Sequence, residues 1–414
     1  MKNEQNAPKI RFKGFTDAWE QRELGKIGET YTGLTGKTKE DFGHGEAKFV
    51  TYMNVFSNPV AEISMTEPIE IDKKQNEVKF GDVFFTTSSE TPEEVGMSSV
   101  WLENCDNMYL NSFCFGYRPS EKINPYYMAY MLRSENVRKK ITFLAQGISR
   151  YNISKNKMME ISIPLPSFEE QRQIGAYFRN LDHLITLHQR KCETLKKLKK
   201  SMLQKMFPKN GSHFPEIRFA GFTDAWEQRE VSDVAEITAG GTPSTSVKEY
   251  WNPKQVPWLS SGEVHKKYIT YTDDKISEEG LNHSSARMIK ENSVLIALAG
   301  QGKTRGTVAI NRIPLSTNQS IAAMTFTSEI CPEFIFSNLE NRYDELRRIS
   351  SGDGTRGGLN KQLVGDVIIP YTFLKEQQAI GKFFTNLDHL ITLHQRKLET
   401  LKKLKKAMLQ KMFI

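Results

Sequence analysis

Residues 297–304 are the first segment whose residue types and spacing could do chemistry. They read Ala-Leu-Ala-Gly-Gln-Gly-Lys-Thr, close to the glycine-rich loop that binds nucleotide phosphates, with alanine in place of the first glycine. A true phosphate loop leads from a strand into a helix, so that backbone amides and the helix dipole meet the phosphate. Here a second strand-like run, residues 305–310, follows. The segment therefore predicts a β-hairpin with flexible polar donors at its tip.

Two other patterns suggest catalysis or metal binding until their context is considered. Residues 124–127 read Asn-Pro-Tyr-Tyr, similar to the Asn-Pro-Pro-Tyr of amino-methyltransferases, but the second proline and an upstream glycine-rich cofactor loop are missing. His183 and His188 are five residues apart on a predicted helix, about 500° of rotation, and do not share a face as zinc ligands would. The sequence predicts no catalytic residue and no metal site.

The elements that position these residues are duplicated. Residues 8–24 recur at 215–231 with 14 of 17 positions identical, and residues 180–207 recur at 386–413 with 26 of 28 identical. A repeat of this length determines the architecture before any local motif does. We expect six segments: two leading segments, two variable domains of similar length, and two long helices, at 1–24, 25–166, 167–209, 210–231, 232–373 and 374–414.

The second repeated block predicts a coiled-coil helix. Apolar residues recur at steps of four and three, the narrow seam of a coiled coil, over about 38 residues or roughly 57 Å. Two such stripes most economically bury each other, and the duplication favours an antiparallel pair. The lysines at 196, 197, 199 and 200 are expected on a solvated face. The predicted seam residues are Ile174, Phe178, Leu181, Ile185, Leu195, Met202, Ile380, Phe384, Leu387, Ile391, Leu398, Leu401 and Met408.

Each variable region predicts a mixed domain, α/β or α+β. Strand-like runs occupy residues 83–87 and 294–298, and Pro125 and Pro332 open amphipathic helices, the first capped by Asn124 and running to about residue 143. Both regions end on a matched stretch, residues 149–155 and 355–361, before a strand and a proline. One scaffold with different contents suggests one task performed on two different targets.

Charge and composition narrow the classes of function. The net charge is +8, and the excess lies in two segments: residues 167–209 carry 10 basic and 4 acidic groups, and residues 374–414 carry 9 and 3. The four cysteines form no CxxC pair, and no apolar run approaches the ~18 residues of a membrane span. We expect a folded cytoplasmic protein without a membrane segment, whose basic charge favours nucleic acid as a partner.

Together these features resemble the specificity subunits of type I restriction–modification enzymes. The resemblance covers nearly the whole chain. It consists of the duplication, the Gly-Phe-Thr-Asp-Ala-Trp-Glu of both leading segments, and a proline, Glu-Gln and isoleucine at the start of each helix, as in Pro166, Glu170-Gln171 and Ile174. The second variable region adds residues 240–244, 256–259 and Asn318-Gln319. The first lacks the Gly-Thr-Pro segment, and it has Asn111-Ser112 where the second has Asn318-Gln319.

The resemblance implies two target-recognition domains, related by a pseudo-twofold duplication and separated by the helical pair. Each would read one half of a bipartite site in double-stranded DNA. It also implies two modification subunits that methylate adenine and restriction subunits that translocate and cut DNA. S-adenosylmethionine, ATP and magnesium would then bind those partners, and this chain would hold no cofactor and would not be an enzyme by itself.

The candidate DNA contacts are polar or basic residues near the matched stretches and the predicted hairpin. Arginine suits guanine, and asparagine or glutamine suits adenine, whereas phosphate contacts only set the register. The shared Arg150/Arg356 stretch could contact phosphate, contact bases or be scaffold. A coiled-coil scaffold with two protein-binding domains, or an enzyme, is the competing function. The candidates are Arg150, Tyr151, Asn152, Lys155, Asn156, Gln301, Lys303, Arg305, Arg356, Asn360 and Lys361.

Overall fold

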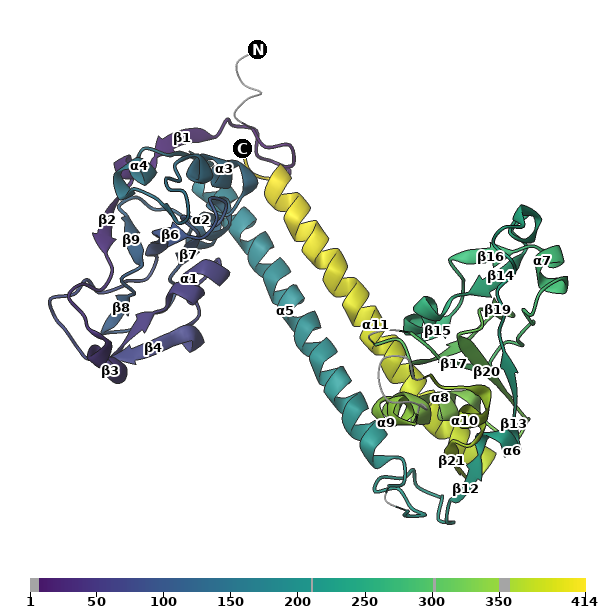
Figure 1. Cartoon of the computed structure of the whole chain (residues 1–414). Helices are drawn as coiled ribbons and strands as arrows, with labels where there is room; N and C mark the ends of the chain where they lie inside the picture. The colour runs from purple at the N-terminus through teal and green to yellow at the C-terminus, as the bar shows by residue number, and fades with distance from the viewer. Residues whose placement is uncertain (1–6, 210, 301–302, 350–357) are drawn as a thin grey trace. The chain divides into compact units, whose positions relative to one another are not determined.

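The chain divides into two compact units in a computed structural model that describes residues 7–209, 211–300, 303–349 and 358–414 (Figure 1). Unit 1 comprises Met1–Gln189 and Arg396–Ile414, and unit 2 comprises Arg190–Gln395. Each unit holds one variable domain and one end of each long helix, α5 (Phe168–Lys205) and α11 (Leu374–Lys411).

The variable domain of unit 1 is built on two small sheets. The first has the order β2-β9-β5-β7 and is antiparallel, and the second has the order β4-β3-β8 with β3 and β8 parallel. Four short helices complete it. The strands are β2 (Gly28–Thr32), β3 (Phe42–Val50), β4 (Thr66–Ile69), β5 (Val83–Thr86), β7 (Ser98–Val100), β8 (Met108–Leu110) and β9 (Cys114–Pro119); the helices are α1 (Tyr52–Ser57), α2 (Pro125–Met131), α3 (Glu135–Phe143) and α4 (Lys155–Met159).

The variable domain of unit 2 repeats this topology. Its sheets have the orders β13-β20-β17-β18-β15 and β16-β14-β19. Among the described residues, the edge strand β15 (Tyr268–Ile269) is additional, and the ladder of β6 (Ser88–Ser89) with β10 (Tyr151–Asn152) in the first domain has no counterpart. The strands are β13 (Ala235–Ala239), β14 (Val256–Leu259), β16 (Asp274–Ile276), β17 (Val294–Ala297), β18 (Val308–Asn311), β19 (Ser316–Thr317) and β20 (Ile321–Phe326); the helices are α6 (Val231–Val234), α7 (Glu278–Asn282), α8 (Pro332–Asn341), α9 (Tyr343–Arg348) and α10 (Lys361–Gly365). The two domains therefore share one fold despite their different sequences.

A glycine at the end of the first strand shows why the first domain keeps the fold without the Gly-Thr-Pro segment. Gly33 follows β2 and Gly240 follows β13. A Cβ atom at Gly33 would lie 2.1 Å from the carbonyl oxygen of Asn111, and one at Gly240 would lie 2.2 Å from that of Asn318. Only glycine permits so close an approach of two backbones.

The predicted helix over residues 125–143 is wrong in one respect, because it breaks into α2 and α3. Asn124 caps α2 as expected, accepting a hydrogen bond from the Tyr127 amide at 3.0 Å. The break at residues 132–134 directs the side chain of Arg133 onto the carbonyl oxygens of Val55 and Ser98, 2.8 and 2.7 Å away. Burial lowers the pKa of Arg133 to about 10. The guanidinium of Arg133 thereby donates hydrogen bonds to carbonyl groups at the carboxyl end of α1. Helical periodicity in the sequence does not indicate such a tertiary contact.

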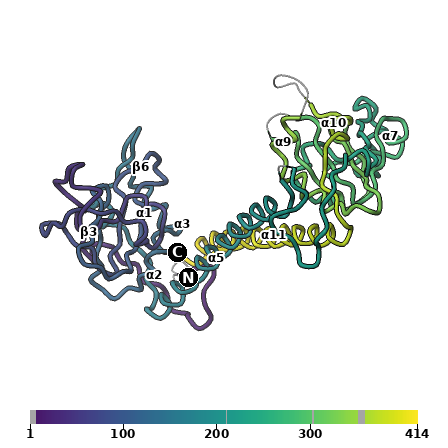
Figure 2. The backbone as a smooth tube through the Cα atoms, turned by 90° about the horizontal axis from the view of Figure 1, so that it is seen from below, coloured from purple at the N-terminus to yellow at the C-terminus, as the bar shows by residue number. Residues whose placement is uncertain are grey.

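The long helices pack antiparallel in each unit, as predicted (Figure 1, Figure 2). In unit 1 the ring of Phe178, near the start of α5, stacks 5.6 Å from that of Phe413, which follows α11. In unit 2 the rings of Phe207 and Phe384 stack at 6.0 Å in the equivalent arrangement. All predicted seam residues are buried or half-buried; Ile185, Met202, Leu398 and Met408 are the half-buried ones.

One lysine of the basic run contradicts the prediction of a solvated face. Lys196, Lys197 and Lys200 are exposed, but Lys199 is 7% exposed and its Nζ atom lies 2.6 Å from carboxylate oxygens of both Glu340 and Asp388. The repeat gives Lys405 the same role, since its Nζ atom lies 2.5 Å from Asp182. Antiparallel pairing of two nearly identical helices brings each seam lysine opposite the other copy's aspartate.

Candidate nucleic-acid interface

The Glu-Gln pair at the start of each long helix ties two segments to that helix, the leading segment through the glutamate and the variable domain through the glutamine. The carboxylate of Glu170 is fully buried and accepts two hydrogen bonds from the guanidinium of Arg11, at 2.7 and 2.8 Å, and one from the indole of Trp19 at 3.2 Å. Gln171 accepts from the Asn124 amide and donates to the Pro166 carbonyl, each at 2.9 Å. The motif that carried the family resemblance is therefore structural.

The second copy makes the same contacts with one addition. Glu376 accepts from Arg218 at 2.6 and 2.8 Å, from the indole of Trp226 at 3.1 Å, and also from the hydroxyl of Thr372 at 2.6 Å. Gln377 accepts from the Cys331 amide at 2.9 Å. Two short ladders, β1 (Glu20–Glu23) with β11 (Ser162–Leu165) and β12 (Glu227–Glu230) with β21 (Ile368–Tyr371), close the two domains in the same way.

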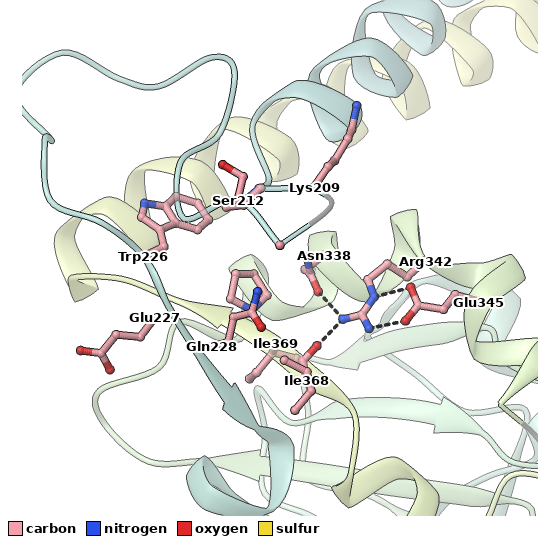
Figure 3. A pocket seen from close by; sticks show the side chains of 13 residues that line it. Lys209, Ser212, Trp226, Glu227, Gln228, Asn338, Arg342, Glu345, Ile368 and Ile369 are labelled. Atoms are coloured by element: carbon pink, nitrogen blue, oxygen red, sulfur yellow. Dashed lines mark hydrogen bonds and ion pairs between the residues drawn. The ribbon is translucent and has the colours of Figure 1, made fainter.

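A cavity of about 320 Å³ lies where α5 of unit 2 leads into the connecting segment (Figure 3). Trp226, Asn338 and Arg342 line it. The guanidinium of Arg342 already donates to the Glu345 carboxylate and the Ile368 carbonyl, each at 2.5 Å. Because these polar groups already pair with each other, we assign the cavity to the junction between α5 and the variable domain of unit 2.

The matched stretch of unit 1 lies at the carboxyl end of the central strand β5. Tyr151 and Asn152 form β10 and pair with Ser88 and Ser89 of β6. The Ile153 amide donates to the Thr87 carbonyl at 3.0 Å. This pairing holds the half-buried Tyr151 in place and leaves Asn152 exposed.

Arg150 is exposed and lines a cavity of about 410 Å³. The other walls come from α1, through Tyr52 and Met53, and from the turn after β6, through Glu90 and Glu94. Burial raises the pKa of Tyr52, whose hydroxyl donates to the Ser88 carbonyl at 2.9 Å. The cavity thus combines a guanidinium donor, carboxylate acceptors and an apolar wall.

Lys155 and Asn156 follow Arg150 closely in sequence and lie on the first turn of α4. The helix is anchored by Met158, which is fully buried, while Asn156 is exposed and Lys155 is half-buried. The five candidates of the first domain therefore form one continuous stretch, residues 150–156, beside the end of β5.

The second domain repeats this arrangement. The Leu359 amide donates to the Leu298 carbonyl at 3.0 Å, the counterpart of the bond from Ile153 to Thr87. Asn360 and Lys361 therefore lie at the carboxyl end of β17, and both are exposed. The Asn360 side chain caps α10, accepting from the Leu363 amide at 2.8 Å. This cap gives Asn360 a structural role as well.

The predicted hairpin brings further candidates to the same end of β17. β17 and β18 pair antiparallel, with Leu295 opposite Ala309, so the phosphate-loop-like segment connects two strands as expected. Lys303 is exposed, its carbonyl accepts from the Tyr343 hydroxyl at 2.9 Å, and Arg305 is half-buried. Gln301 and Arg356 lie outside the described residues.

Several residues of these surfaces were missed by sequence reasoning. Met53, Glu90 and Glu94 reach the cavity of Arg150 from segments with no motif or periodicity, and no sequence signal could have found them. Asn111, noted only as a departure from the family pattern, forms a turn: its side chain accepts from the Phe113 amide and donates to the Val50 carbonyl, each at 2.9 Å.

Neither a metal-binding cluster nor a membrane-spanning helix is found among the described residues. Within residues 7–209, 211–300, 303–349 and 358–414, no three His, Cys, Asp or Glu side chains gather in a way that could hold a metal ion. His183 and His389 are exposed on the long helices. No helix in this part of the chain is long and apolar enough to cross a membrane.

The chain belongs to the type I restriction modification DNA specificity domain family. The family model matches twice, at residues 16–197 and 223–403, once for each half of the duplication. The chain is therefore a specificity subunit of the type I restriction–modification class, a non-catalytic class whose role is DNA recognition.

Relatives and solved structures agree with this assignment. A Methanocaldococcus jannaschii protein, provisionally assigned as the specificity subunit of type I restriction enzyme MjaX, is 24% identical over 98% of this chain and 95% of its own. The HindI specificity subunit of Haemophilus influenzae is 30% identical over 37% of this chain and 35% of its own. The S subunit of a type I system from M. genitalium has the same fold, with a TM-score of 0.64, 15% identity and 99% of both chains covered.

Proposed function

We propose that this chain reads a bipartite DNA site, one half with each variable domain, and directs adenine methylation or restriction by partner subunits. One observation carries the proposal. The same topology occurs twice, and in both copies polar residues gather at the carboxyl end of the central strand. In sequence, residues 150–156 and 356–362 match only at Arg150/Arg356 and Lys155/Lys361, and the other positions differ. A shared frame with unlike contact residues is what two different half-sites require.

The chemistry of the two surfaces indicates how each half-site would be read. In the first domain, Arg150 beside Glu90 and Glu94 offers both donors and acceptors, which suits base edges, whereas carboxylates would repel phosphates. Lys155, on the first turn of α4, is a candidate for phosphate contact. In the second domain, Lys303, Arg305 and Lys361 provide positive charge at the equivalent place.

The catalytic functions belong, in this proposal, to other chains. Two modification subunits would bind S-adenosylmethionine and methylate adenine, and restriction subunits would use ATP and magnesium. A type I restriction–modification structure concerned with complex assembly and conformational transition has a chain of the same fold, with a TM-score of 0.51, 19% identity and 94% of this chain covered. Such a complex would act on DNA in the cytoplasm.

The test is to produce the chain with its modification subunits, measure DNA binding at several salt concentrations and map the methylated adenines. We expect salt-dependent binding and a split motif. Arg305→Ala should weaken binding by about 1–3 kcal/mol and relax one position of one half-site if the side chain contacts a base, or weaken all sequences alike and reduce the salt slope if it contacts phosphate.

Lys290→Ala is the matched control for this variant. Lys290 is an exposed cation that precedes β17, at the opposite end of the strand from Arg305. It should leave both the affinity and the motif unchanged. DNA binding that is absent at every salt concentration would favour a protein-binding scaffold and refute the proposal, and cofactor or ATP binding by the isolated chain would favour an enzyme.

A further inference from the structure

The last residue of α3 and the loop after it carry the two most exposed large apolar side chains of the described chain. Ile148 is 96% exposed and Phe143 is 88% exposed. Single exposed apolar residues are ordinary on protein surfaces, but an isoleucine whose whole side chain lies in water gains nothing from folding. Its surroundings therefore decide whether it has a role.

Backbone hydrogen bonds hold Ile148 at the tip of a closed ribbon. The amide of Gln146 donates to the carbonyl of Asn152 at 2.9 Å, and the amide of Asn152 donates back at 2.8 Å. Gly147 has φ of +141°, and a Cβ atom there would lie 2.1 Å from the carbonyl oxygen of Arg150. The turn thus depends on glycine and presents Ile148 in one defined arrangement.

The base of this ribbon is fixed to the domain. Asn152 and Tyr151 continue into the ladder with β6, whose residues line the cavity of Arg150. Ser149 and Arg150, the two residues after Ile148, line the same cavity. The tip therefore places one apolar side chain beside a hydroxyl and a guanidinium, and carboxylates lie in the adjoining wall.

We propose that Ile148 is a specificity-determining residue that contacts the 5-methyl group of a thymine in the half-site read by the first domain. The proposal rests on the proposed function. The major groove of B-DNA admits a two-stranded ribbon, and its floor offers one apolar group, the thymine methyl, beside donors and acceptors. The tip supplies the matching set: isoleucine for the methyl, serine for a donor or acceptor, and arginine for guanine.

The repeat also predicts an asymmetry between the half-sites. At the offset of 206 residues that aligns the matched stretches, Ile148 corresponds to Gly354. Glycine has no side chain to meet a methyl group. The thymine contact should therefore be confined to one half of the recognised site, which provides an internal control.

The experiment uses the complex of this chain with its modification subunits and a duplex that contains the mapped motif. Each thymine of the motif is replaced in turn by uracil, which lacks only the 5-methyl group, and affinities are measured for the wild type and for Ile148→Ala. Burial of one methyl group is worth about fourfold in affinity. One uracil in the first half-site should weaken the wild type about fourfold and should not weaken Ile148→Ala further.

Phe80→Ala is the matched control, because Phe80 is also exposed, at 54%, but precedes β5, whereas the ribbon lies beyond its other end. It should leave the uracil penalty intact. Equal uracil penalties in the wild type and Ile148→Ala at every position would overturn the thymine contact while leaving the proposed function standing. Loss of assembly with the modification subunits in Ile148→Ala without DNA would also overturn it, by assigning the side chain to a protein interface.

Discussion

Glu376→Gln is the most direct test of the buried contact that ties the leading segment to the start of each long helix. Glu376 is fully buried, and its carboxylate accepts four hydrogen bonds, from Arg218, Trp226 and Thr372. Glutamine keeps the shape but removes the charge, and its amide nitrogen cannot accept from Arg218. The guanidinium, whose side chain is 13% exposed, would then lose half of its bidentate partner.

The hydrogen bonds of Glu376 set the expected loss in the free energy of unfolding. A hydrogen bond to a charged group contributes about 1.5–3 kcal/mol, so Glu376→Gln should cost about that amount. Removing the partner altogether, in Glu376→Ala, leaves a buried guanidinium uncompensated and should cost about 3–5 kcal/mol. Glu170→Gln should cost somewhat less, because position 166 is a proline and supplies no counterpart of the Thr372 hydroxyl.

The assay is urea unfolding followed by tryptophan fluorescence, since Trp226 donates to Glu376 and Trp19 to Glu170. With a slope of about 2 kcal/mol per molar urea, a loss of 2 kcal/mol moves the midpoint by about 1 M. Glu399→Gln, an exposed glutamate of α11 that lies 4.0 Å from Lys402, is the control and should change stability by less than about 0.5 kcal/mol. An equally small change for Glu376→Gln would refute the reasoning.

Three further predictions concern the helices and the domains. Leu195→Asp, at a position 8% exposed, should cost several kcal/mol in unfolding experiments, whereas Lys197→Ala on the exposed face should cost less than about 0.5; an unaffected Leu195→Asp would exclude the seam. Burial, the largest influence, would raise the pKa of Glu340, but Lys199 and Lys267 together lower it. The contribution of Glu340 to the free energy of unfolding should therefore be complete above about pH 4.5 and fade as the pH falls through the lower folded value. It should decrease in Lys199→Ala, which leaves Lys267 as the partner. Exchanging residues 25–166 with residues 232–373 leaves both helices unchanged, so the methylated motif should keep its spacer and exchange its halves. An unchanged or unsplit motif would contradict the proposal that each variable domain reads one half-site.

The candidate DNA-contact surface of the first domain, residues 150–156 and the walls of the Arg150 cavity, shows where sequence reasoning reached its limit. Residues 150–156 were identified because the stretch is matched between the halves, and the structure places it beside β5. Met53, Glu90 and Ile148 carry no motif. Met53 and Glu90 meet Arg150 only because α1 and the turn after β6 fold onto the same end of that strand. Non-periodic loops leave no pattern from which such a meeting could be predicted.

The sequence by itself determined the duplication, the family, the antiparallel helices and their seam. These follow from near-identical repeats and from an apolar period of 3.5 residues, both of which are properties of the chain read in order. Only the tertiary structure decided that Lys199 is buried rather than solvated, that the helix after Asn124 breaks before Arg133, and that the Glu-Gln motif is a clamp. Each of these depends on a buried charge that pairs with a group in a distant segment, because an unpaired charge is costly away from water. The order of residues in the sequence does not indicate which distant segment supplies the partner.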